Sequence, residues 1–119
     1  MPYIYPMHGV VLTSTFERQA KALGLDDEEL LDIVSLIAAD PEGGDLMPGT
    51  GGARKMRHAG RGHGKRGGYR TIHYFGGDDV PLFLLSVIDK GRRSDLSAAE
   101  KNQLAAILPR IAAAYRRRQ

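Results

Sequence analysis

The stretch of residues 69–88, YRTIHYFGGDDVPLFLLSVI, determines the fold that the sequence predicts. Its first part, Tyr69–Phe75, is rich in the β-branched and aromatic residues that favour strands. Its last part, Leu82–Ile88, is almost continuously apolar, which is typical of a central strand covered on both faces. The GGDD segment at residues 76–79 favours a turn between them, so the stretch predicts an antiparallel hairpin.

Two further strands are predicted upstream of this hairpin. Ala53–His58 precedes it, and Val10–Leu12 lies near the N-terminus. Residues 41–52, PEGGDLMPGTGG, form a turn-rich loop, because glycine and proline interrupt regular structure. The order of the elements favours an antiparallel meander of the last three strands, in a small sheet of about four strands.

Two short helices are predicted between the first strand and the turn-rich loop. Ser14 and Glu17 have the spacing of a capping box, and Gly24 supplies a left-handed C-terminal cap. Asp26 and Glu29 repeat the capping-box spacing, and an apolar stripe at spacings of three and four follows them. The short link between the two helices indicates a helical hairpin.

A C-terminal helix is predicted from Ser97, because Glu100 completes a third capping-box pattern. Pro109 lies inside the apolar pattern of this helix and is expected to kink or restart it. The predicted fold class is therefore α+β, with an N-terminal helical hairpin and a C-terminal helix packed on a small antiparallel sheet. The helix residues expected to face the core are Leu104, Ile107, Leu108 and Ile111.

The length of 119 residues predicts one domain, which we place at residues 10–115, between a flexible tail at 1–9 and a basic tail at 116–119. No apolar run approaches the ~20 residues needed to span a bilayer, and the N-terminal MPYIYPMHG lacks the features of a secretory signal. The absence of cysteine excludes disulfides, thiol catalysis and cysteine-ligated zinc. We therefore expect a cytoplasmic protein without a membrane partner.

Charge is segregated along the chain. Residues 1–45 contain nine acidic and two basic side chains, whereas residues 46–119 contain fifteen basic and five acidic ones. No acidic residue occurs between positions 46 and 77. A field of one sign attracts polyanions such as nucleic acid, and a merely solvated surface is the alternative interpretation.

The predicted strands can bring several cations together. Lys55 and Arg57 point to the same face of one strand, because strand side chains alternate, and Arg70 and Tyr74 share a face of the next. Lys90 can join from the edge of the sheet. Cations and a phenol suit phosphodiester cleavage of RNA, in which the substrate supplies the 2′-hydroxyl nucleophile and arginines hold the phosphate. Lysine or tyrosine can then transfer protons.

Three blocks of sequence resemble the RelE/HigB-type toxins of the RelE/ParE superfamily: GTGGARKMR at residues 49–57, GKRGGYRTIHYF at 64–75, and FLLSVIDK at 83–90, followed by SDLS at 94–97. The resemblance covers roughly residues 10–112 and implies a RelE-like fold. It also implies the toxin of a type II toxin–antitoxin system. Such a toxin inhibits translation as a ribosome-dependent, metal-independent mRNA endoribonuclease that acts in the A site and needs no cofactor.

The resemblance also implies site residues and partners. Lys55 and Arg57 fall on the basic pair after the family's glycine-rich loop, Arg70 on the arginine of its Gly-Tyr-Arg strand, and Lys90 on a basic position after the last strand. The implied partners are the ribosome with its mRNA, and an antitoxin of the helix-turn-helix HigA type in a hetero-oligomer. The residues expected to bind RNA are Arg54, Arg61, Lys65, Arg66, Arg92 and Arg93.

The group that transfers protons is left open by the sequence. Some family members have a tyrosine near the start of the last helix, where this chain has Ser97, which we interpret as a helix cap. Tyr74 can substitute as a catalyst or can simply pack in the core. His58 or His73 can serve as a proton shuttle, but no carboxylate or cysteine cluster accompanies them, so no metal site is predicted.

Two functions of other classes are compatible with the sequence. One is a basic protein that binds RNA or DNA without cleaving it. The other is a poison of DNA gyrase, because the ParE branch shares the fold of the RelE toxins.

Overall fold

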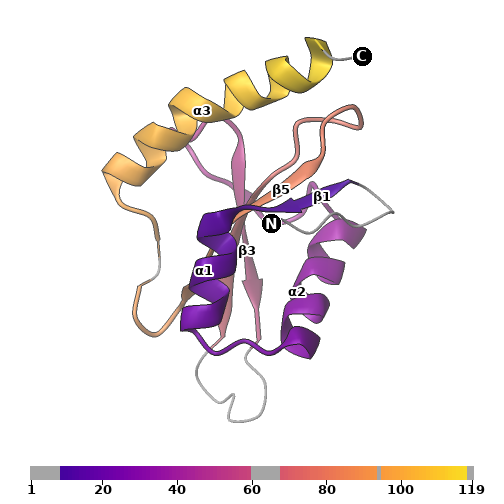
Figure 1. Cartoon of the computed structure of the whole chain (residues 1–119). Coiled ribbons are helices and arrows are strands. Elements are labelled where there is room, and N and C mark those ends of the chain that lie inside the picture. Colours follow the sequence, from indigo (N-terminus) through magenta and orange to yellow (C-terminus); the bar gives the residue numbers. More distant parts are fainter. Residues whose placement is uncertain (1–8, 60–67, 94, 118–119) are drawn as a thin grey trace.

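The computed structural model describes residues 9–59, 68–93 and 95–117. It has an α+β fold, as predicted, in which helices cover both faces of one five-stranded sheet (Figure 1). No helix in these residues is both long and apolar enough to cross a membrane. The elements in chain order are β1 (Val10–Leu12), α1 (Ser14–Ala22), α2 (Asp27–Ala39), β2 (Asp45–Leu46), β3 (Ala53–His58), β4 (Tyr69–Tyr74), β5 (Leu82–Asp89) and α3 (Ala98–Arg117).

The predicted meander is confirmed, since β3, β4 and β5 pair antiparallel in sequence order. The sheet as a whole is mixed, however, and has the order β1-β5-β4-β3-β2. β1 pairs parallel to β5, with Val10 opposite Leu82, and the two-residue β2 pairs with β3. The prediction of about four antiparallel strands is therefore wrong in these two details. Strands of two or three residues are too short for their side-chain pattern to indicate a partner or a direction.

The predicted N-terminal cap is confirmed for α2 but is wrong for α1. Asp26 and Glu29 form the predicted capping box at the start of α2, with Glu29 N donating to Asp26 Oδ1 over 2.8 Å. At α1 the predicted pair of Ser14 and Glu17 is wrong, because Thr13 is the N-cap and accepts from the Phe16 amide. The Thr13 hydroxyl also donates to the backbone carbonyl of β5 at 3.0 Å, a long-range contact that fixes where the helix begins.

Two hydrophobic clusters lie on opposite faces of the sheet. In the first, α1 and α2 run in opposite directions and pack with Phe16 and Ile37 against one face (Figure 1). In the second, α3 packs on the other face, where Leu108 contacts a cluster that includes Ile72 and Tyr74. The sheet is thus the middle layer of three, and α3 crosses only one end of it (Figure 1).

Helix α3 begins at the predicted capping box, in which Ser97 N donates to Glu100 Oε1 and Glu100 N donates to Ser97 Oγ. It continues to Arg117 without restarting at Pro109. Of the predicted core stripe, Leu108 is fully buried, but Ile107 is 48 % exposed, which corrects that prediction. The buried contact is instead continued by Ala112, one turn after Leu108.

Candidate functional site

The register of β3 and β4 places three of the predicted catalytic residues on one face of the sheet. Arg57 lies directly opposite Arg70, and Lys55 lies opposite Ile72, two positions along. Because side chains alternate along a strand, Lys55, Arg57 and Arg70 all project to the side that carries α3. We call these three residues the cationic face. The cationic face lies next to the part of the sheet that α3 covers. Ile72 and Tyr74 are buried in that covered part.

The residues of the cationic face differ in their exposure to solvent. Arg57 is exposed, whereas Lys55 and Arg70 are partly buried. Arg70 pairs on its second side with Ile88 of β5, which is buried and provides an apolar neighbour. Within residues 9–59, 68–93 and 95–117, Arg57 forms no ion pair.

The direct opposition of Arg57 and Arg70 works against stability. Residues opposite each other in an antiparallel pair have Cβ atoms about 5 Å apart, and like charges at that separation destabilise the pair by up to about 1 kcal/mol. A bound phosphate would remove this repulsion, because each guanidinium can donate two parallel hydrogen bonds to its oxygens. The register therefore places two arginines on adjacent strands, an arrangement that suits the binding of a phosphate.

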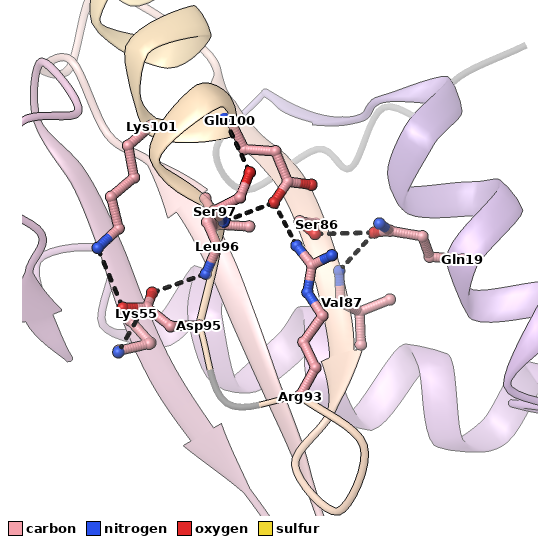
Figure 2. A network of polar contacts seen from close by, with 10 residues as sticks. All are labelled: Gln19, Lys55, Ser86, Val87, Arg93, Asp95, Leu96, Ser97, Glu100 and Lys101. Atoms are coloured by element: carbon pink, nitrogen blue, oxygen red, sulfur yellow. Dashed lines mark hydrogen bonds and ion pairs between the residues drawn. The ribbon is translucent and has the colours of Figure 1, made fainter.

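Lys55 has a carboxylate neighbour that sequence reasoning missed. Its Nζ lies 3.6 Å from Asp95 Oδ1, and Asp95 Oδ2 accepts from Lys101 Nζ at 3.0 Å (Figure 2). Partial burial raises the pKa of Asp95, but bonds from Lys101 and the Leu96 amide, together with the charge of Lys55, lower it below its usual range overall. Asp95 is 40 positions from Lys55 in the chain, and nothing in the sequence connects them.

The basic residues after β5 lie at the same end of the sheet as Arg70. Lys90 is the first residue beyond the strand, is exposed, and donates its backbone N–H to Gly68 O at 3.2 Å. Arg92 has an 83 % exposed side chain and a loose contact of 3.9 Å with Asp89. Arg93 is paired with Glu100 of α3 (Figure 2).

Four other residues were predicted to bind RNA, and the structure does not place any of them on the cationic face. They are Arg54, Arg61, Lys65 and Arg66. Arg54 alternates with Lys55 on β3 and therefore projects from the other face, where its Nη1 donates to Glu42 O at 2.7 Å. Arg61, Lys65 and Arg66 lie outside the described residues.

Tyr74 lies at the far end of β4 from Arg70. Tyr74 is four positions further along the strand than Arg70, so their Cα atoms are about 13 Å apart. The Tyr74 side chain is only 8 % exposed and belongs to the cluster beneath α3. Gly52 and Gly76 both lie against its ring. The structure thus places Tyr74 in the core, and Ser97 at the start of α3, where it caps the helix.

His58 and His73 project to the face that α1 and α2 cover. Nε2 of His58 lies 2.8 Å from Thr71 Oγ1, and Nε2 of His73 lies 2.9 Å from Pro41 O. Burial, and then the charge of His73, lowers the pKa of His58 to about 4. Burial also lowers the pKa of His73, although its bond to Pro41 raises it in part. Both rings are thus separated from the cationic face by the sheet itself.

The described residues contain no group of three or more histidine, cysteine, aspartate or glutamate side chains that could hold a metal ion. The site is therefore composed of cations from β3 and β4, with Asp95 at its border with α3.

A comparison with protein families decides the assignment. The model of the family described as the RelE toxin of the RelE/RelB toxin–antitoxin system matches residues 8–118. The chain belongs to the RelE toxin family. It is accordingly the toxin of a toxin–antitoxin system, with an antitoxin as its partner. RelE-family toxins are generally endoribonucleases, which accords with a site made of cations on adjacent strands.

Proposed function

We propose that this RelE-family toxin is an endoribonuclease that cleaves mRNA in the A site of the ribosome and thereby stops translation. The observation that carries the proposal is the opposition of Arg57 and Arg70 on adjacent strands, with Lys55 beside them on the same face. Like charges directly opposite each other on adjacent strands repel, and an anion bound by both would offset that repulsion.

In the proposed reaction the substrate's own 2′-oxygen attacks the adjacent phosphorus. The bond from phosphorus to the 5′-oxygen breaks, which leaves a 2′,3′-cyclic phosphate on one fragment and a 5′-hydroxyl on the other. Arg70 and Arg57 hold the phosphate and stabilise the charge that grows on its oxygens. Lys55 completes the cationic face beside them. Because the substrate supplies the nucleophile, the protein has to provide only positioning, charge stabilisation, an acceptor for the 2′-hydroxyl proton and a donor for the departing 5′-oxygen.

The surroundings of the cationic face suit RNA outside the scissile phosphate. Lys90 and Arg92 are exposed at the same end of the sheet and would contact the backbone of mRNA or of ribosomal RNA. Arg93 would have to leave Glu100 to do so. Tyr74 is assigned to packing in this proposal, because its ring is buried and about 13 Å of strand separate it from Arg70. Proton transfer then falls to Lys55, to Lys90 or to groups of the ribosome.

The proposal also covers the partners. We expect a helix-turn-helix antitoxin of the HigA type, in a hetero-oligomer with the toxin, and the cytoplasm as the place of action because ribosomes are there.

The test is primer extension on mRNA with purified protein, with and without programmed ribosomes. The wild type should cut within the A-site codon only when ribosomes are present. Arg70→Ala should lower the rate about 10²–10³-fold, the usual effect of removing one preorganised donor. Arg70→Lys should restore only part of it, because lysine keeps the charge but lacks the planar fork of arginine.

Arg18→Ala is the matched control, since it removes an exposed arginine from α1, outside the cationic face. Cleavage by Arg70→Ala at the wild-type rate would contradict the role of Arg70. Binding of RNA with a steep salt dependence but no cleavage by the folded wild type would favour a non-catalytic binding protein. Intact mRNA together with trapped DNA breaks would favour a gyrase poison.

A further inference from the structure

The Asp95 carboxylate is held in place by groups outside the cationic face. Its Oδ1 accepts from the Leu96 amide at 2.8 Å, and its Oδ2 accepts from Lys101 Nζ at 3.0 Å (Figure 2). Lys101 belongs to α3, and Leu96 lies two residues before the helix begins. The carboxylate is therefore oriented by groups other than Lys55, and it presents Oδ1 to the Lys55 ammonium at 3.6 Å.

The start of α3 does not need Asp95 as a cap. Ser97 and Glu100 already satisfy each other's backbone amides, and Arg93 is paired with the same Glu100 (Figure 2). Asp95 lies before this capping box, so its bonds go beyond what a helix terminus requires. Its contact with Lys55 joins the residues just before α3 to β3, in addition to the hydrophobic cluster in which α3 packs on the sheet.

Lys55 needs such a partner to stay at the cationic face. A lysine side chain has about 2 kcal/mol of rotamer entropy and can move its ammonium over several ångströms. Arg57 on the same strand and Arg70 on the next repel it. The other charged neighbour in the register is Asp45 of β2, which pairs with Lys55 across the strands but is itself exposed. Asp95 is thus the fixed carboxylate that opposes the repulsion.

We propose that Asp95 is a positioning residue for the RNA-cleaving reaction, and that it acts by holding the Lys55 ammonium beside Arg57 and Arg70. The inference rests on the proposed function. It assigns to the loop before α3 a part in the reaction without any contact between Asp95 and the substrate. Because its pKa is lowered, Asp95 stays ionised through the neutral range and keeps this role there.

The test is a double-mutant cycle in the ribosome-dependent cleavage assay, with Lys55→Met, Asp95→Asn and the combination of both. Asp95→Asn should lower kcat about tenfold, the rate equivalent of an ordinary pairwise coupling, while KM for programmed ribosomes changes less than about twofold. In the Lys55→Met background the same substitution should change kcat less than about twofold. Asp95→Glu, which keeps the charge, should recover part of the loss.

Asp79→Asn is the matched control. Asp79 pairs with Arg116 at the other end of α3, and its side chain is 41 % exposed against 40 % for Asp95. It should leave kcat unchanged, and thermal unfolding should show that all the variants are folded. Equal losses from Asp95→Asn with and without Lys55, or an unchanged kcat, would overturn the role of Asp95 alone. A folded wild type that never cleaves would instead overturn the proposed function, and the role of Asp95 with it.

Discussion

Protonation of His58 should destabilise the toxin well before its carboxylates titrate. His58 is 7 % exposed, and among the described residues its buried Nδ1 has no hydrogen-bond partner. Protonation would put an N–H on both ring nitrogens and would bury a positive charge, which is costly without a pairing group. The folded protein therefore keeps His58 neutral, while the unfolded chain takes up the proton readily.

The size of the effect follows from the pKa of His58, which folding lowers from 6.5 to about 4. The stability that the neutral ring contributes is present above pH 6.5 and is lost as the pH falls toward 4, because in that window the unfolded state binds more protons. Each pH unit below 6.5 removes about 1.4 kcal/mol. Between pH 7.5 and 5.0 the loss from His58 is thus about 2 kcal/mol, a large part of the 5–15 kcal/mol that is usual for a domain.

The measurement is urea unfolding of the wild type and of His58→Gln at pH 7.5 and 5.0. Glutamine can keep a hydrogen bond to Thr71 but does not titrate. The free energy of unfolding of the variant should fall about 2 kcal/mol less between the two pH values than that of the wild type. His73 is present in both proteins, so its own titration cancels from the comparison to first order.

Equal pH dependences of the wild type and the variant would refute this reasoning, because His58 would then have the same pKa in the folded and unfolded states. A direct check is the NMR titration of the His58 ring nitrogens in the folded protein. A midpoint near 6.5 instead of about 4 would contradict the buried neutral ring.

Three further substitutions test how the structure supports the site. Gln19→Ala should lower the free energy of unfolding by about 1–3 kcal/mol, measured by chemical denaturation, because Gln19 Oε1 accepts from the Val87 amide at 2.9 Å beyond the end of β1. Asp26→Ala should cost about 1 kcal/mol in the same assay by removing the cap of α2, with no change in the cleavage rate of the folded protein. Gly44→Ala should lower the free energy of unfolding by more than about 2 kcal/mol and should also lower the cleavage rate. Gly44 has a φ of +81°, and a Cβ would lie 2.4 Å from the Lys55 carbonyl oxygen. A fully active and stable variant would show that β2 does not support β3.

The elements with local signals were predictable from the amino-acid sequence alone. The hairpin of β4 and β5, the capping boxes of α2 and α3, and the strand β3 all depend on residues within a few positions of one another. The cationic face was predictable for the same reason. Alternation along a strand puts Lys55 and Arg57 on one side, and a meander puts Arg70 beside them.

The contacts between segments that are distant in the chain could be found only in the folded protein. The parallel pairing of β1 with β5, the choice of Thr13 over Ser14 as helix cap, the burial of Tyr74 under α3 and the contact of Asp95 with Lys55 all involve residues far apart in the chain. Such contacts depend on how the helices pack on the sheet, and side-chain periodicity contains no information about that packing. The position of α3 is the clearest case: because it covers one end of the sheet, Tyr74 is enclosed there, while Arg57 at the other end stays open to an anion.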